Sequence, residues 1–232
     1  MNTSHIMTTP VITVGPETPV REIATLLLEN RISGVPVLEN GRLIGLVSEA
    51  DLLHRHEIGT DCAAPAGSWW LRLFSADRSP SDYIRSHARQ ARDVMAREIV
   101  SVTEDTPVAD IANLLEARRI KRVPVMNGEK LVGIVSRANL VQALAATRRL
   151  RTTANPDSDS ATRGRLLAEL ERQPWWRTAS SSVIVADGVV HYWGLLYSDD
   201  EREAARVAAE NVPGVSRIED HRHKIEDLPS MV

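Results

Sequence analysis

Two short polar motifs carry the residue types best suited to hold a small polar molecule. Ser48 and Asp51 are three positions apart, and Ser136 and Asn139 repeat that spacing 88 positions later. A carboxylate can accept hydrogen bonds from two neighbouring hydroxyl groups. Each serine is predicted to begin a helix, where unpaired backbone N–H groups and the helix dipole favour phosphate. A Ser-x-x-Asp sequence is also typical of a capping box, which needs no ligand. Both interpretations stay open at this point.

The histidine pairs and the single cysteine indicate less chemistry. His54-x-His56 and His221-x-His223 lack acidic or cysteine partners at a recognisable ligand spacing, so we expect surface histidines and no metal site. Cys62 has no second cysteine for a disulfide and no obvious base near it in sequence. The sequence also contains no Gly-x-Ser-x-Gly elbow, P-loop or His-Glu-x-x-His motif. We therefore expect a protein that is not an enzyme.

The two polar motifs belong to an internal repeat. Residues 11–55 align with residues 99–143 without a gap, and 19 of the 45 aligned pairs are identical. The match continues upstream, where Ile6-Met7-Thr8 aligns with Val94-Met95-Ala96. Similarity at one constant shift predicts that the two segments share one fold.

Each copy is predicted to be a β-α-β-β-α unit. In the first copy, Thr18 is predicted to cap a helix that has Pro19 at its first position. Asn40-Gly41 predicts a tight hairpin turn. The other predicted elements are a β-rich run at 11–14, a helix with an apolar stripe from Val20 to Leu27, strands at 35–38 and 43–47, and a second helix from Ser48. A unit this short buries little surface alone, so the two copies are expected to pack on each other.

These motifs resemble the signature of the cystathionine-β-synthase (CBS) domain. The first copy carries it at 18–19, 32–37 and 45–51, and the second copy at 106–107, 120–125 and 133–139. A tandem CBS pair is called a Bateman module, and the resemblance covers roughly residues 1–148. It implies an α/β fold in which the two repeats form a pseudo-two-fold pair.

The same resemblance implies two clefts between the repeats that bind adenosine-containing ligands. AMP, ADP or ATP is the expected ligand, ahead of NAD or S-adenosylmethionine. In such modules one repeat supplies a ribose-binding carboxylate and the other supplies a strand that contacts adenine. Carried over, one cleft has Ser48 and Asp51 opposite Ile99, Val100 and Ile120, and the other has Ser136 and Asn139 opposite Val11, Ile12 and Ile32.

Further side chains complete this predicted site. Lys121, Arg122 and Arg137 could contact phosphate oxygens, and Ser33 occupies in the first copy the position that Lys121 has in the second. Lys121-Arg122 could equally be a solvated pair at a helix end. Asn139 departs from the family's carboxylate, so we expect the cleft with Asp51 to bind the ligand better.

Two further regions surround the repeats. The insert at 58–92 contains Trp69, Trp70 and Phe74, which predict either a short helix packed on the module's own surface or a contact with a partner. Residues 149–162 are polar and aperiodic and predict a linker. The predicted domains are 1–57 (repeat 1), 58–92 (insert), 93–148 (repeat 2), 149–162 (linker), 163–225 (C-terminal module) and 226–232 (tail).

The C-terminal module is predicted to have the order α-β-β-α-β. Asp187-Gly188 predicts a hairpin turn, and Trp175-Trp176 are expected to be packing residues. The sequence at 185–190, with Gly194 and 212–215, resembles a BON domain. BON domains are often tied to phospholipid or envelope functions, yet residues 163–224 hold nine basic and ten acidic residues. That balance favours a protein or small-ligand partner over an anionic membrane surface.

Composition limits the remaining possibilities. The net charge of −3 and isoelectric point of about 6.2 give no basic field to attract nucleic acid. No run of about 18 apolar residues predicts a membrane span, and the polar start lacks a secretory signal, so a cytoplasmic location is expected. We expect a non-catalytic, homodimeric regulatory protein with an unidentified protein target. The alternative is a constitutive scaffold with empty clefts, which recruits partners through its C-terminal module and tryptophan-rich insert.

Overall fold

The computed structural model describes residues 1–53, 87–146, 156–178 and 180–227. By their internal contacts, the residues form two compact units. The first, called here the repeat-1 unit, is Ile12–Ile99, and the second, the repeat-2 unit, is Met1–Val11 with Val100–Val232. The chain therefore passes from one unit to the other twice, at 11–12 and at 99–100. The predictions for His54, His56, Cys62 and the tryptophan-rich insert concern residues outside the described ranges.

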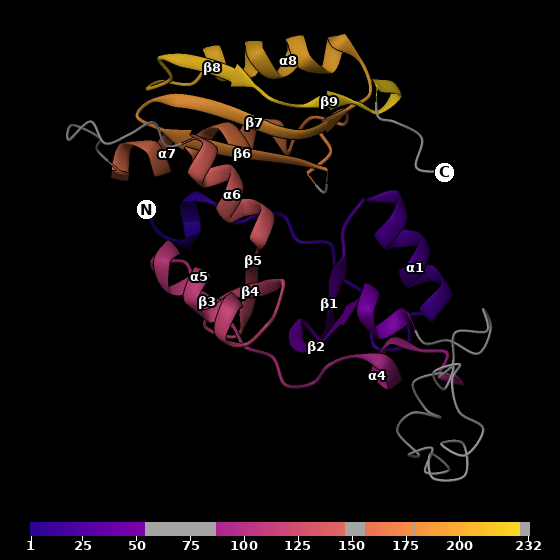
Figure 1. Ribbon diagram of the computed structural model, residues 1–232. Helices are drawn as coiled ribbons and strands as arrows, with labels where there is room; N and C mark the ends of the chain where they lie inside the picture. The colour runs from indigo at the N-terminus through magenta and orange to yellow at the C-terminus, as the bar shows by residue number, and fades with distance from the viewer. Residues whose placement is uncertain (54–86, 147–155, 179, 228–232) are drawn as a thin grey trace, which may run out of the picture. The chain divides into compact units, whose positions relative to one another are not determined.

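The repeat-1 unit is a two-stranded sheet with a helix packed against it (Figure 1). Its core is aliphatic and includes Ile23, Leu27, Val35 and Val37, all buried. Its elements are α1 (Val20–Glu29), the antiparallel pair β1 (Gly34–Glu39) and β2 (Arg42–Ser48), the 3₁₀ helix η2 (Glu49–Leu52) and α4 (Ala91–Val94).

The repeat-2 unit contains the second copy of this arrangement. Its three-stranded sheet has the order β3-β4-β5, with β3 parallel to β4 and β4 antiparallel to β5. The elements are η1 (Thr3–His5), β3 (Val102–Thr103), α5 (Val108–Ala117), β4 (Arg122–Asn127), β5 (Lys130–Ser136) and α6 (Arg137–Ala146). The register of β4 with β5 repeats that of β1 with β2, including the shift in the middle of the strands.

Each repeat's sheet is completed by residues from the start of the other repeat, upstream of the segments 11–55 and 99–143 that align without a gap. Thr8 forms an antiparallel bridge with Ile134 of β5, and Ala96 forms the equivalent bridge with Leu46 of β2. Met7 packs against Gly133 and Met95 packs against Gly45, so the two exchanges obey the same 88-residue shift. The repeats are thus not independent stretches of chain.

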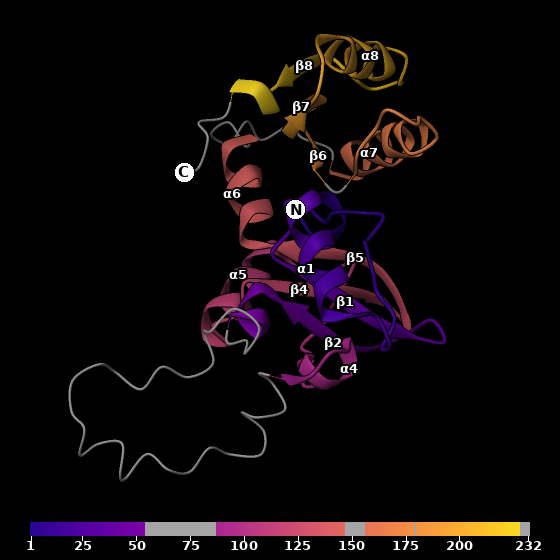
Figure 2. The same ribbon diagram turned by 90° about the vertical axis from the view of Figure 1, so that its right-hand side faces the viewer.

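The C-terminal module lies within the repeat-2 unit and places two helices on one face of a sheet (Figure 2). Its elements are α7 (Pro156–Leu170), β6 (Ser181–Ala186), β7 (Val189–Leu196), α8 (Asp199–Glu210), β8 (Arg217–Asp220), β9 (His223–Lys224) and η4 (Ile225–Asp227). The strands lie in the order β6-β7-β8, and β9 also pairs with β7. Trp176 is buried and meets the ring of Tyr192 edge-on, which confirms the expected packing role of that tryptophan.

Helix α7 begins earlier than the sequence pattern indicates. The predicted polar linker, residues 149–162, overlaps the first turns of this helix. Their inward face is polar rather than apolar, so no apolar stripe indicates a helix there. Asp159 accepts hydrogen bonds from the backbone N–H groups of Asp187 and Gly188, at 2.8 and 2.9 Å. Thr162 and Arg163 are also buried. A hydrophobic periodicity could not reveal a helix that starts in this way.

Smaller predictions have mixed outcomes. Asn40-Gly41 and Asp187-Gly188 form hairpin turns with left-handed backbone at all four positions, as expected. Thr18 does not cap α1; its hydroxyl accepts a hydrogen bond from Gly15 N–H, 3.1 Å away. The β-rich run at 11–14 contributes only one bridge, between Val14 and Val37.

Candidate ligand-binding site

The first polar motif forms a compact hydrogen-bonded turn at the end of β2. The Ser48 backbone N–H and hydroxyl both donate to Asp51 Oδ2, at 2.8 and 2.7 Å. This is the capping box that the spacing also allowed. Both bonds go to the same oxygen, so Oδ1 of Asp51 takes part in neither, and the residue is half-buried. The carboxylate therefore has a structural role and keeps an oxygen with which to accept further bonds.

The second motif has the same turn with different surroundings. Ser136 N–H and Oγ donate to Asn139 Oδ1 at 2.8 and 2.7 Å, and Asn139 N–H points back to Ser136 Oγ at 3.4 Å. The Asn139 side chain also donates from Nδ2 to Thr8 Oγ1, 3.3 Å away. Asn139 is buried, with 4% of its surface exposed. Both ends of its amide are thus engaged inside the protein.

Other predicted residues join these motifs within each unit. In the repeat-1 unit, Gly34 pairs with Ser48, and Glu49 N–H donates to Ser33 O at 3.1 Å, which brings Ile32 and Ser33 beside the first motif. In the repeat-2 unit, Arg122 pairs with Ser136, and Arg137 N–H donates to Lys121 O at 3.1 Å. Ile120 is partly buried against the core of the second repeat.

The interpretation of Lys121 and Arg122 as a helix-end pair does not fit the structure. Helix α5 ends at Ala117, Lys121 lies in the connection that follows, and Arg122 is the first residue of β4. Lys121 and Arg137 are exposed, and Arg122 is half-buried. These residues gather around the second polar motif, not around the end of α5.

The four residues predicted to contact adenine from the connecting segments lie where the chain passes between units. Val11 and Val100 belong to the repeat-2 unit, whereas Ile12 and Ile99 belong to the repeat-1 unit, and all four are half-buried. Each predicted cleft therefore draws on residues of both units, and their meeting across a cleft stays a prediction.

Sequence reasoning missed one residue of the second motif. Thr8 lies just upstream of residues 11–55 of the first copy, yet its hydroxyl is an acceptor for Asn139 of the second copy. The available signal was the upstream alignment, in which Thr8 faces Ala96 at a position where the two copies differ in polarity. The difference coincides with the exchange of aspartate for asparagine between Asp51 and Asn139.

Comparisons with known proteins agree with this architecture. Residues 4–57 and 91–146 match the CBS domain, and residues 158–222 match the BON domain. The uncharacterized protein MJ1426 of Methanocaldococcus jannaschii is 32% identical over 149 residues, which cover 60% of this chain and 88% of that protein. The CBS domain-containing protein CBSX1, chloroplastic, of Arabidopsis thaliana is 33% identical over 144 residues, which cover 59% of this chain and 60% of that protein. The crystal structure of CBSX2 in complex with AMP matches with a TM-score of 0.52 and 28% identity, covering 62% of this chain and 96% of that chain.

The chain belongs to the family of CBS-domain proteins. It consists of two CBS domains, a Bateman module, followed by a C-terminal BON domain. Among the described residues, no helix combines the length and the apolar character needed to cross a bilayer.

Proposed function

We propose that this protein is a non-catalytic regulator whose paired CBS domains bind an adenosine-containing ligand, with AMP, ADP or ATP ahead of NAD or S-adenosylmethionine. The observation that carries the proposal is the half-buried Asp51 carboxylate, which is held by Ser48 through Oδ2 while Oδ1 remains outside the turn. The similarity to CBSX2, a CBS protein crystallised with AMP, supports the choice of ligand class.

The chemistry of binding follows from the residue types. A turn that fixes Asp51 Oδ2 leaves Oδ1 to accept hydrogen bonds from the vicinal ribose hydroxyls. Ile99, Val100 and Ile120 would cover the faces of the purine, because aliphatic side chains line such pockets. Lys121 and Arg122 follow Ile120 directly and would add charge-assisted bonds to phosphate oxygens.

The second motif should bind less well. Asn139 is buried and uses its amide for Ser136 and Thr8, so a ribose would have to displace bonds that the protein already makes. An unmade bond to a buried amide costs about 1–3 kcal/mol. We therefore propose one preferred cleft, built around Asp51, rather than two equal ones.

Regulation would follow from ligand binding. A ligand that binds one packing of the repeats better than another shifts the population toward that packing. We propose that the protein acts on another chain and works as a homodimer. The competing hypothesis, a scaffold with empty clefts, predicts that no nucleotide stabilises the protein.

A thermal-shift panel separates the two hypotheses. Full-length protein is heated with AMP, ADP, ATP, NAD or S-adenosylmethionine, and GMP serves as the matched control for phosphate and ribose without adenine. A ligand at 100 times its Kd adds about 2.7 kcal/mol to stability and raises Tm. Stabilisation by adenosine ligands over GMP supports the proposal, and an unchanged Tm with all five contradicts it.

A further inference from the structure

We propose that the BON domain holds a divalent transition-metal site of the zinc class, formed by His191, Glu219 and His221. Three ligand atoms converge there. His191 Nδ1 lies 3.2 Å from His221 Nε2 and 3.5 Å from Glu219 Oε2, and His221 Nε2 lies 3.8 Å from Glu219 Oε2. All lie within 4.8 Å of one another.

These separations fit one ion bound by all three atoms. Zinc binds imidazole nitrogen at about 2.0–2.1 Å and carboxylate oxygen at about 2.0–2.2 Å. A tetrahedron with bonds of that length has edges of about 3.3–3.6 Å. The three observed distances, 3.2, 3.5 and 3.8 Å, lie around those edges. Small side-chain movements would therefore suffice to place an ion between them.

The sheet positions the three ligands together. His191 lies in β7 and is paired with Glu219 of β8 in the parallel ladder. His221 follows β8, and its backbone N–H donates to Tyr192 O at 2.8 Å, which fixes the chain at that point. Two of the three ligands thus lie on directly paired strands, and the third lies one residue beyond the end of β8.

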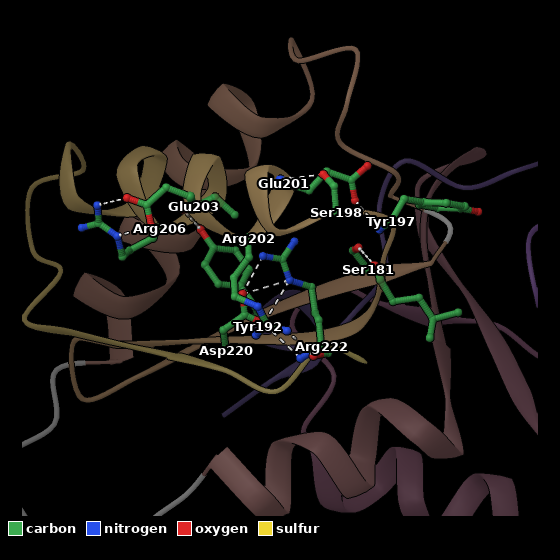
Figure 3. A network of polar contacts seen from close by, with 12 residues as sticks. Ser181, Tyr192, Tyr197, Ser198, Glu201, Arg202, Glu203, Arg206, Asp220 and Arg222 are labelled. Carbon is green, nitrogen blue, oxygen red and sulfur yellow. Dashed lines mark hydrogen bonds and ion pairs between the residues drawn. The ribbon is translucent and has the colours of Figure 1, made fainter. Parts of the chain in front are cut away.

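The residues next to the three ligands in sequence are anchored in a polar network. Figure 3 shows Tyr192, Asp220 and Arg222 grouped beside α8. Tyr192 Oη donates to Ala205 O at 2.8 Å, and Arg222 forms a paired contact with Asp220, including a 2.6 Å bond. Burial raises the pKa of Tyr192. Side chains alternate along a strand, so anchoring Tyr192 and Asp220 on one face fixes the positions of their neighbours His191 and Glu219 on the other.

The surroundings of the three ligands also suit metal binding. His191 is buried, while the side chains of Glu219 and His221 are 25% and 33% exposed, so an ion can enter from solvent. Arg217 contacts Glu219 Oε1 at 2.7 Å and leaves Oε2 facing the histidines. The Trp193 ring stacks on His221 with a 4.0 Å centroid separation, which restrains the imidazole. Outer contacts of this kind orient metal ligands.

The ligand types select the class of metal. Imidazole with a carboxylate suits zinc and neighbouring transition metals, whereas magnesium and calcium prefer sets made of oxygen. Without an ion, the 3.2 Å contact between the two imidazoles is a hydrogen bond, so a purely structural histidine pair is the competing explanation. The sequence prediction of no metal site considered His221 with His223 and did not include His191, which is 30 positions away from His221.

The test uses the full-length protein after treatment with EDTA. Zn²⁺ is titrated by calorimetry and in competition with a chromophoric chelator, and Co²⁺ is added to record its absorption bands. His221→Ala and Glu219→Gln each remove one ligand from a partly exposed position. His223→Ala is the matched control, because His223 is exposed and lies two residues further on. A His54→Ala/His56→Ala variant controls for the other His-x-His sequence.

We expect one tightly bound Zn²⁺ per chain and Co²⁺ bands typical of tetrahedral coordination. His221→Ala and Glu219→Gln should each weaken binding by more than about 100-fold, beyond the effect of losing an outer contact. The two control variants should bind as the wild type does. The proposal is overturned if Zn²⁺ does not bind at micromolar concentration, or if His221→Ala leaves its affinity unchanged.

Discussion

The two CBS repeats build the same polar turn and place it in different environments. In both, a serine N–H and hydroxyl donate to one side-chain oxygen three residues later, at 2.8 and 2.7 Å. In the first repeat that oxygen belongs to a half-buried aspartate, and in the second to a buried asparagine that also bonds Thr8. The two turns share these hydrogen bonds, while the change from aspartate to asparagine removes a charge and accompanies deeper burial of the acceptor side chain.

The segments that complete the two sheets also differ in their surroundings. Ser4 and Arg92 occupy equivalent positions, and the carbonyl oxygen of each accepts a hydrogen bond from an arginine. Ser4 O receives it from Arg163 at 2.7 Å, whereas Arg92 O receives it from the exposed Arg97 at 3.0 Å. In the repeat-2 unit, an arginine of the BON domain thus binds the segment that completes the sheet. In the repeat-1 unit, the arginine that binds the equivalent segment is only five residues away along the chain.

The largest effect should come from replacing Arg163, whose buried side chain donates hydrogen bonds to three backbone carbonyl groups. Arg163 donates to Ser4 O, Met7 O and Val183 O at 2.6–2.7 Å, and desolvation lowers its pKa to about 10, so it stays charged at neutral pH. Arg163→Met should destabilise the repeat-2 unit by about 3 kcal/mol, because buried carbonyl groups lose their donors. Denaturant unfolding and hydrogen exchange of residues 1–11 measure this loss.

Arg97→Met is the matched control for Arg163→Met. Arg97 makes its single described bond at an exposed position, so its loss should cost less than about 0.5 kcal/mol. Equal destabilisation by the two variants would show that the two segments are held alike.

The sequence predicted the elements whose signals are local. The 88-residue shift and the glycine-containing turns located both repeats and the BON hairpin. It failed where the deciding contact is distant along the chain. The first turns of α7 show no apolar stripe, because Asp159 and Arg163 face backbone groups that hydrophobic periodicity cannot anticipate.

The candidate site shows the same limit. Spacing located Ser48 and Asp51 and predicted their capping box as one alternative. It could not show that Met7 and Thr8 lie on the second repeat, because an alignment treats each copy as one continuous stretch. Side-chain contacts across more than a hundred positions, such as Asn139 with Thr8, depend on that exchange.

The second prediction compares Gly45 and Gly133, the two glycines against which Met95 and Met7 pack. A Cβ at Gly45 would lie 2.9 Å from Met95 Cβ, and a Cβ at Gly133 would lie 3.2 Å from Met7 Cβ. Overpacking costs about 1–3 kcal/mol. Gly45→Ala should therefore lower stability by about 2 kcal/mol and Gly133→Ala by less, as measured by denaturant unfolding.

Gly164→Ala should change stability in the opposite direction. Gly164 lies within α7, and the position that an alanine Cβ would take there has no neighbouring atom within 4 Å beyond the helix's own backbone. Alanine should therefore stabilise the helix by about 0.5–1 kcal/mol. A loss of stability at Gly164 as large as at Gly45 would remove packing as the explanation.

The third prediction exchanges the residues that distinguish the two polar turns. Asp51→Asn retains an acceptor for Ser48 but removes the charge, and it should weaken AMP binding about tenfold, or about 1.4 kcal/mol. Asn139→Asp should change AMP affinity less than twofold, because the new carboxylate would be buried beside Thr8. Calorimetric titration of both variants measures the difference. A greater loss from Asn139→Asp than from Asp51→Asn would reverse the assignment of the preferred cleft.

A smaller loss of stability than that at Gly45 should come from removing the partner of Asn139. Thr8→Val keeps the side-chain shape and deletes the acceptor for Asn139 Nδ2, so stability should fall by about 1 kcal/mol. Denaturant unfolding measures the change, and Ala96→Thr at the equivalent exposed position should be neutral. If Thr8→Val costs nothing, the Thr8 bond does not hold the second turn in place. The contrast between the repeats would then rest on the charge of Asp51 alone.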